Sequence, residues 1–204
     1  MGQRRITLLE TIARIRQELR AYMDITEAAE IARRYFVTNS FDSALGLLGL
    51  IIGSYIIKVN DPRIVLSSGL GTTFAMFLSG FVGTYLMERA ERLRELRELE
   101  RSMLVSLENS LLEKAQKMAS IMVALASGLA APFSSVVTLL PFVIAYMGLS
   151  SINIAYFWAL VQGLLFLFML GFFMGKISHE NRILYGILAM ILGLLIAMLG
   201  VIFR

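Results

Sequence analysis

The sequence predicts an all-α integral membrane protein with five transmembrane helices and a cytoplasmic N-terminus. The 204 residues are 57% hydrophobic and 17% charged, and their mean hydropathy is +0.73. A soluble domain carries about 25% charged residues. The apolar residues gather in five long runs, and the basic residues concentrate on one side of those runs.

Each run has at least the roughly 20 residues that a helix needs to cross about 30 Å of hydrocarbon. The runs cover residues 36–57, 64–87, 118–147, 152–175 and 183–203. The third contains Pro132 and Pro141. It is therefore either one kinked, tilted helix or a helix that breaks before it leaves the membrane.

The basic residues set the orientation, because lysine and arginine accumulate in cytoplasmic loops. Of the 19, all except Lys58, Arg63 and Arg204 lie before the first run, between the second and third, or between the fourth and fifth. We expect those segments to be cytoplasmic and the C-terminus to be external. The net charge of +4 is accounted for by this topology and gives no reason to expect nucleic-acid binding.

The first segment, residues 1–35, has no apolar core typical of a cleavable signal peptide. Ile6, Leu9 and Ile12 begin a series of apolar residues at helical spacing, with arginines between them. This pattern indicates an amphipathic helix that lies on the cytoplasmic leaflet, or a soluble helix packed on the cytoplasmic loop. The membrane domain then covers residues 36–204.

The composition excludes several kinds of chemistry. There is no cysteine, and His179 is the single histidine. Disulfides, zinc ribbons, iron–sulfur clusters, thiol catalysis, histidine metal cages and Ser-His-Asp triads are therefore excluded. An intramembrane enzyme is the weakest hypothesis because the runs contain no paired aspartates or Ser-His arrangement. We expect no enzyme activity and no permanently bound cofactor.

Asp42 is the one acidic residue within the five runs, which hold no basic residue. A carboxylate in the hydrocarbon region is costly unless it is hydrated, paired or protonated, and it indicates a functional site. The alternative is that residues 38–42 begin the helix and that Asp42 caps it. Residues 43–57 alone would span only about 22 Å, which favours the functional interpretation.

Two further groups of residues are candidate metal ligands. Met76 in the second run offers a soft thioether, although methionine is also an ordinary core residue. A charged helical segment over 88–117 carries Glu88, Glu91, Glu95 and Glu98 at spacings of 3, 4 and 3, followed by Glu113. Such a row can bind divalent cations, but the spacing alone favours a solvated helix with ion pairs such as Glu88 with Arg92 and Glu98 with Arg101.

The first run resembles that of the vacuolar iron transporter family of divalent-metal transporters. Asp42-Ser43-Ala44-Leu45-Gly46 leads to Gly53, eleven positions after the aspartate. Ala75-Met76-Phe77 is similar to the Ser-Met stretch of the family, and Leu139-Leu140-Pro141-Phe142 to its Pro-x-x-Pro end, with Thr138 in place of the first proline. The last two runs match in layout, so the resemblance covers roughly residues 30–204.

This resemblance implies a homodimer of five-helix subunits that exports iron(II), and often manganese(II), in exchange for protons. Asp42 would be the metal and proton site, Met76 a soft ligand, and Glu91, Glu95, Glu98 and Glu113 the remnant of a cytoplasmic metal-binding domain. Ser79 and Gly80 stand where the family usually places a glutamate, and the cytoplasmic segment is shortened to about 30 residues. The sequence thus resembles a divergent member.

The competing hypothesis is a non-transporting membrane scaffold of the same fold, in which residues 1–35 and 88–117 recruit partners. The small size favours a prokaryotic plasma membrane as the location of either. The sequence leaves open which metal moves and in which direction.

Overall fold

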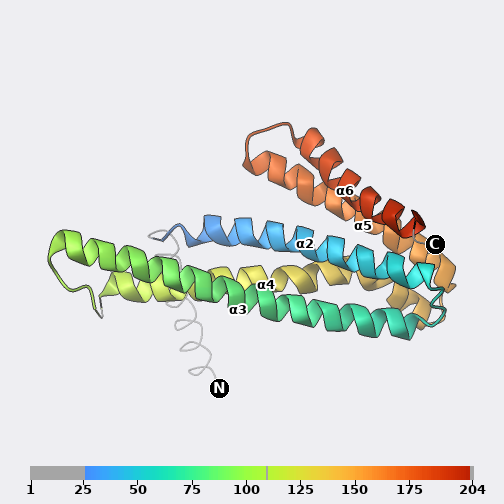
Figure 1. Ribbon diagram of the computed structural model, residues 1–204, viewed down its shortest axis with the longest axis horizontal. Coiled ribbons are helices and arrows are strands. Elements are labelled where there is room, and N and C mark those ends of the chain that lie inside the picture. The colour runs from blue at the N-terminus through green and yellow to red at the C-terminus, as the bar shows by residue number, and fades with distance from the viewer. Residues whose placement is uncertain (1–25, 109, 203–204) are drawn as a thin grey trace, which may run out of the picture. The chain divides into compact units, whose positions relative to one another are not determined.

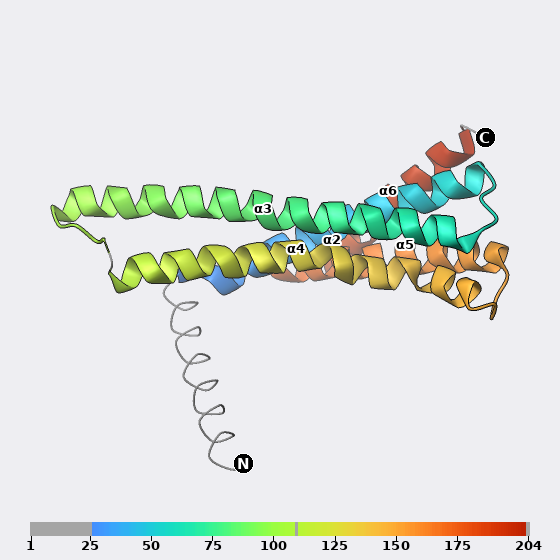
Figure 2. The same ribbon diagram turned by 90° about the horizontal axis from the view of Figure 1, so that it is seen from below.

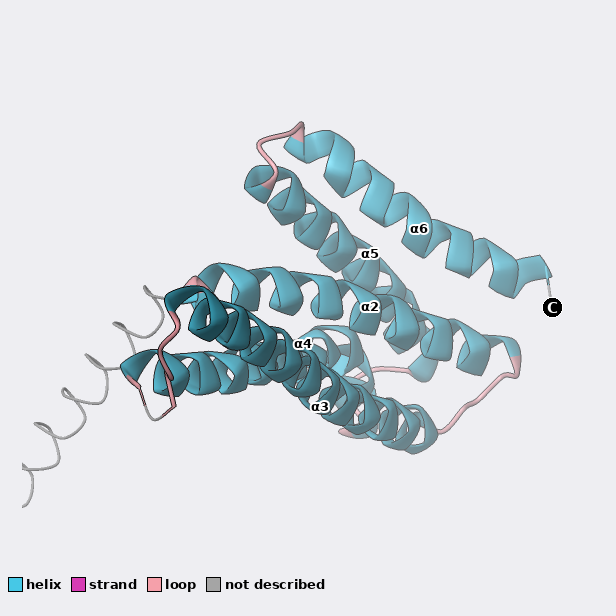
Figure 3. Ribbon diagram, turned by 60° about the vertical axis from the view of Figure 1, so that its left-hand side comes forward, coloured by secondary structure: helices cyan, strands magenta, loops and turns pink. Residues whose placement is uncertain are grey.

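The computed structural model describes residues 26–108 and 110–202, and Figure 3 shows only helices and loops among them. The helices are α2 (Ala28–Ile56), α3 (Pro62–Met103), α4 (Leu111–Tyr146), α5 (Ile152–Ile177) and α6 (Arg182–Ile202). The all-helical prediction is confirmed for this part of the chain. Most of the amphipathic helix predicted over 1–35 lies outside the described residues.

Four of these helices, α2 to α5, are long and apolar enough to cross a membrane. The fifth, α6, is apolar over Arg182–Met198. The four long helices are what an integral membrane protein requires. The fifth span and the orientation stay predictions.

Most helices begin at a polar side chain that accepts a backbone N–H of the first turn, as N-cap residues do. Asp61 accepts the N–H of Arg63 at 2.9 Å before α3, and Asn181 accepts that of Ile183 at 3.1 Å before α6. Ser151 caps α5. These caps fix where each helix starts after its short loop.

The described residues divide into two compact units. Unit 1 contains residues 26–35, 81–108 and 110–127, and unit 2 contains 36–80 and 128–202. The chain passes from one unit to the other inside α2, α3 and α4.

In unit 1, the end of α3 and the start of α4 run side by side and are joined by the loop 104–110 (Figures 1 and 2). The hydroxyl groups of Thr84 and Ser127 are hydrogen-bonded across the pair at 2.7 Å. Residues 28–35 pack against the same hairpin through a buried cluster of Ala28, Ala119 and Val123. The described end of the predicted amphipathic segment is therefore packed on the α3–α4 hairpin.

The helical segment expected over 88–117 is helical in two parts, because α3 continues beyond residue 87 to Met103 and α4 begins at Leu111. Leu104 has φ 54°, a left-handed conformation that does not continue a helix. The new helix starts where Ser110 accepts the N–H of Glu113 at 3.1 Å. Ser110-x-x-Glu113 is a capping-box pattern, and it would have predicted this boundary.

In unit 2, two apolar clusters hold the helices together. One is centred on Ile51, Val65 and Phe142, and the other on Leu48, Phe166 and Leu167. The helix α4 runs through Pro132 and Pro141 without a break. Of the two forms expected for the third run, the one that breaks is therefore excluded.

Helices α5 and α6 form a close antiparallel pair in unit 2 (Figure 1). Glycines permit this approach, since a Cβ at Gly171 would lie 2.6 Å from the Cβ of Ala189, and one at Gly193 would lie 2.6 Å from Leu167. Small residues allow membrane helices to pack closely. By contrast, a Cβ at Gly53, Gly71 or Gly83 would meet no atom within 4 Å.

Candidate functional site

Asp42 lies at the midpoint of α2, fourteen residues from either end of a continuous helix. It is therefore not an N-cap, and the capping interpretation of residues 38–42 is wrong. The sequence suggested a helix start there because polar residues precede the apolar run. The structure places the start at Ala28 instead, so residues 38–42 form part of the helix interior.

The Asp42 side chain is exposed in unit 2 and makes no hydrogen bond or ion pair with any described residue. A carboxylate in an apolar helix needs hydration, a proton or a cation to offset its desolvation. No described side chain of this chain supplies that compensation to Asp42.

Met76 of α3 lies one helical turn from Asp42 along α2. A Cβ built at Gly46 would be 2.6 Å from the Cε of Met76 and 3.9 Å from its Sδ. Gly46 follows Asp42 by four residues, and residues at this spacing share a helix face, with Cβ atoms about 5–6 Å apart. The absence of a side chain at Gly46 thus lets the thioether of Met76 approach the Asp42 face.

Around this pair, α2 and α3 present small or polar residues outward. We call Asp42, Gly46, Gly71, Ala75 and Ser79 the α2/α3 face; all five are exposed. Gly71, Ala75 and Ser79 recur every four residues, the spacing of small-residue seams in membrane helices. Small residues at this spacing permit a close approach of another helix.

A buried hydroxyl group of α4, which sequence reasoning missed, contacts α2 two residues before Asp42. Ser134 of α4 donates to the carbonyl oxygens of Ser40 at 2.9 Å and Ala130 at 3.0 Å. Ser40 is fully buried, and its Oγ has no hydrogen-bond partner among the described residues. Serines in an apolar run are ordinary in membrane helices, so no pattern in the sequence distinguished this pair.

The predicted carboxylates of unit 1 are mostly engaged with arginine. Glu91 lies 2.7 Å from Arg94, and Glu98 lies 3.6 Å from the same side chain. The pairing expected between Glu98 and Arg101 is replaced by this shared contact with Arg94. Glu95 is exposed on α3. Glu113 lies in the first turn of α4.

The expected pair of Glu88 and Arg92 is confirmed, with 3.3 Å between Oε2 and Nη2. Both side chains are buried, and Arg92 is only 5% exposed. The guanidinium also donates to the carbonyl oxygen of Thr26 at 3.5 Å. Part of the predicted carboxylate row is therefore a structural ion pair, and the spacing predicted the pair but not its burial.

Among the described residues, no three Asp, Glu or His side chains come together closely enough to hold a metal ion. The structure brings Asp42 and Met76 to neighbouring positions and pairs Glu91 and Glu98 through one arginine. A metal site built from this chain would need ligands from a second copy or from water.

No protein-family model matches the sequence. The chain is similar to the uncharacterized protein MJ0645 of Methanocaldococcus jannaschii, with 31% identity over 177 residues, which cover 85% of this chain and 88% of the archaeal protein. The chain belongs to the family of MJ0645. The match extends over most of both chains, so the two proteins share a domain of nearly full length.

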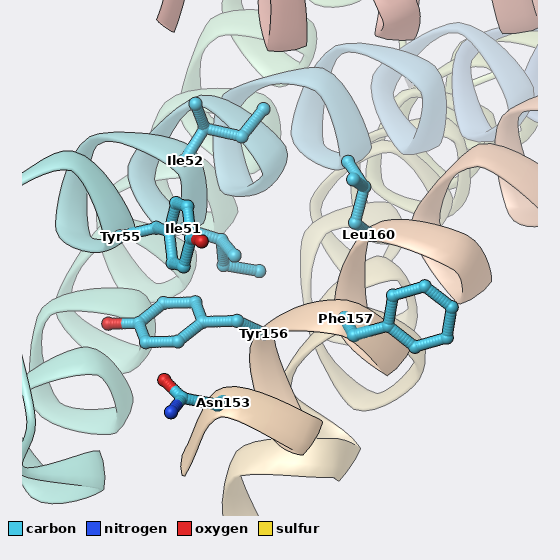
Figure 4. A pocket seen from close by; sticks show the side chains of 7 residues that line it. All are labelled: Ile51, Ile52, Tyr55, Asn153, Tyr156, Phe157 and Leu160. Carbon is cyan, nitrogen blue, oxygen red and sulfur yellow. The ribbon is translucent and has the colours of Figure 1, made fainter. Parts of the chain in front are cut away.

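This member of the MJ0645 family also has a cavity at the end of unit 2 where α2 ends and α5 begins. A cavity of about 220 Å³ is lined by Ile51, Ile52, Tyr55, Asn153, Tyr156, Phe157 and Leu160. Figure 4 shows the rings of Tyr55 and Tyr156 together at one side and Phe157 and Leu160 at the other. Sequence reasoning did not predict it, because its residues come from two helices that are about 100 positions apart.

Proposed function

We propose that this protein carries divalent transition-metal ions, iron(II) or manganese(II), across the membrane as a homodimer and exchanges them for protons. The observation that carries the proposal is Asp42, an exposed carboxylate inside α2, near the start of its apolar run, with no partner among the described residues. Such a residue is expected to bind an ion or a proton.

The neighbouring thioether supports a transition metal as the ion. Met76 lies against Gly46, one turn from Asp42. Sulfur ligands favour softer transition metals, whereas calcium and magnesium prefer oxygen ligands alone. A carboxylate together with a thioether therefore suits a borderline ion such as iron(II) better than a hard one.

The α2/α3 face supports the dimer. Two copies joined through Gly71, Ala75 and Ser79 would approach closely, and the same contact would add a second Asp42 and a second Met76. Two Asp42 carboxylates and two Met76 thioethers would then supply four metal ligands, whereas one chain supplies only two. The ion would then bind at the seam between the subunits.

Proton coupling follows from the chemistry of a single carboxylate. Desolvation favours the protonated form of Asp42, whereas a bound dication favours the ionised form. Metal release is therefore accompanied by protonation, and metal binding by loss of the proton. One titrating group in each subunit suffices for antiport.

The second candidate is the non-transporting scaffold, and the ion pairs of unit 1 favour it. Arg94 engages both Glu91 and Glu98, and Glu88 is committed to Arg92. A cation gathered by these carboxylates would have to compete with the arginines. In the scaffold, unit 1 is an interaction hairpin and Asp42 binds no metal.

Manganese(II) binding to the purified protein separates the two candidates. Isothermal titration of the wild type, Asp42→Asn and Asp61→Asn provides a matched comparison, because asparagine still caps a helix at position 61. We expect saturable binding in the wild type and in Asp61→Asn, and none in Asp42→Asn. Equal titration curves for all three would support the scaffold.

A further inference from the structure

Two adjoining cavities occupy the end of unit 2 where α2 ends and α5 begins. The first has a volume of about 220 Å³ and the second about 230 Å³. They share Tyr55, Asn153 and Tyr156 as lining residues. The two cavities therefore adjoin across these shared side chains, and we treat them as two chemically different halves of one site.

The first half is apolar. Ile51, Ile52 and Leu160 form its floor, and Phe157 its far wall (Figure 4). Tyr55 is 52% exposed and Phe157 62% exposed, so the cavity opens sideways between these rings. Its volume lies below the roughly 300–1,000 Å³ of pockets that enclose a drug-sized ligand, and it therefore fits a segment of a hydrocarbon chain.

The second half is polar and carries one positive charge. Lys58 and Asn60 line it together with Asn153. The Lys58 side chain makes no ion pair with any described residue. Asp61, the nearest acidic residue in the sequence, already accepts the N–H of Arg63. The free charge at the mouth is therefore suited to an anion.

The wall between the two halves is fixed in place. The Tyr156 hydroxyl donates to the carbonyl oxygen of Val59 at 3.0 Å. Its ring contacts those of Tyr55 and Phe142 edge-on, with centroids 5.3 Å and 5.0 Å apart. Contacts within the chain therefore fix this wall, and ligand binding would need little rearrangement of it.

We propose that this site binds one anionic membrane lipid, with its phosphate at Lys58 and Asn60 and part of one acyl chain over Ile51, Ile52 and Leu160. Tyrosines and lysines at the end of a membrane helix are typical of the headgroup region. In that region, the charge of Lys58 would contact the lipid headgroup, and the apolar half of the site would contact an acyl chain. This proposal does not depend on metal transport.

Native mass spectrometry of the detergent-purified protein tests it, with phosphatidylglycerol and phosphatidylcholine of equal chain length as probes. We expect one phosphatidylglycerol to bind in preference to phosphatidylcholine, and Lys58→Gln to reduce this preference about fivefold. Lys176→Gln, at the other end of α5, is the matched control and retains the preference. Equal binding of the two lipids by the wild type would overturn the proposal.

A second pair of variants tests the apolar half. Ile52→Trp fills the floor of the cavity, whereas Leu165→Trp adds the same ring to an exposed position of α5 outside it. We expect only Ile52→Trp to lose the bound lipid. Retention of the lipid by Ile52→Trp, or its displacement by soluble glycerol phosphate as readily as by phosphatidylglycerol, would contradict a lipid site.

Discussion

Met76 occupies the space that a side chain at Gly46 would need, with only 2.6 Å between its Cε and a Cβ built at that glycine. The contact joins α2 to α3 one turn from Asp42. It gives the small residue at position 46 a specific role, which is to admit a thioether beside the carboxylate. The function proposed here depends on that geometry.

The first prediction concerns Gly46→Ala. The added methyl group displaces the end of the Met76 side chain, which is flexible and moves at little cost. We expect the thermal stability in detergent to change little and manganese(II) affinity to fall. Gly53→Ala is the control, because a Cβ there meets no atom within 4 Å. Unaltered affinity in Gly46→Ala would separate Met76 from the ion site.

The second prediction concerns the seam between α5 and α6. In Gly171→Ala, the new methyl group would collide with the carbonyl oxygen of Tyr185 and the Cβ of Ala189. Because backbone atoms cannot move aside, the two helices must separate, at a cost of about 1–3 kcal/mol. Thermal unfolding measures this, and a melting temperature equal to that of Gly53→Ala would contradict the packing.

The third prediction concerns the buried pair in unit 1. Replacing Arg92 by methionine leaves Glu88 buried without its partner, which costs about 3–5 kcal/mol. Arg94→Met removes two exposed pairs, with Glu91 and Glu98, and the loss of each costs less than about 1 kcal/mol. The double variant Glu88→Leu, Arg92→Met should recover most of the stability. If Arg92→Met unfolds at the same temperature as Arg94→Met, the buried Glu88–Arg92 pair contributes no more to stability than an exposed pair.

The fourth prediction concerns topology, which the cysteine-free chain makes simple to test. Single cysteines at Ser106 and Ser178 should react with a membrane-impermeant thiol reagent only from the cytoplasmic side. Cysteines at Asn60 and Arg204 should react only from outside, and one at Leu165, within α5, from neither side. If the cysteine at position 204 reacts from the cytoplasmic side, the chain crosses the membrane four times and the prediction of five spans is wrong.

The sequence predicted the helices well and their ends poorly. An apolar run marks the part of a helix that meets lipid, but hydrogen bonding continues the helix into polar sequence. For this reason α2 begins eight residues before its apolar run. Likewise α3 continues for sixteen residues beyond its apolar run, as expected of the charged segment that follows residue 87. The loop at 104–110 was missed although Ser110 and Glu113 carry a capping-box signal.

The candidate site was predictable only in part. Asp42 was found because a carboxylate is rare in an apolar run. The contact of Met76 with Gly46, the burial of Arg92 and the hydrogen bond from the Ser134 hydroxyl to the Ser40 carbonyl oxygen depend on which helices pack together. The cavity at Tyr55 and Tyr156 likewise joins residues that are far apart in the sequence. Spacing within one helix carries no information on such contacts.

The most direct test of the central claim is the flux of iron(II) and manganese(II) into proteoliposomes under an imposed pH gradient. Wild type, Asp42→Asn and the control Asp61→Asn should be compared at equal protein incorporation. We predict gradient-driven flux in the wild type and in Asp61→Asn, and none in Asp42→Asn. Full flux in Asp42→Asn, or no flux of either metal through folded wild-type protein, would contradict the proposal that Asp42 carries the ion.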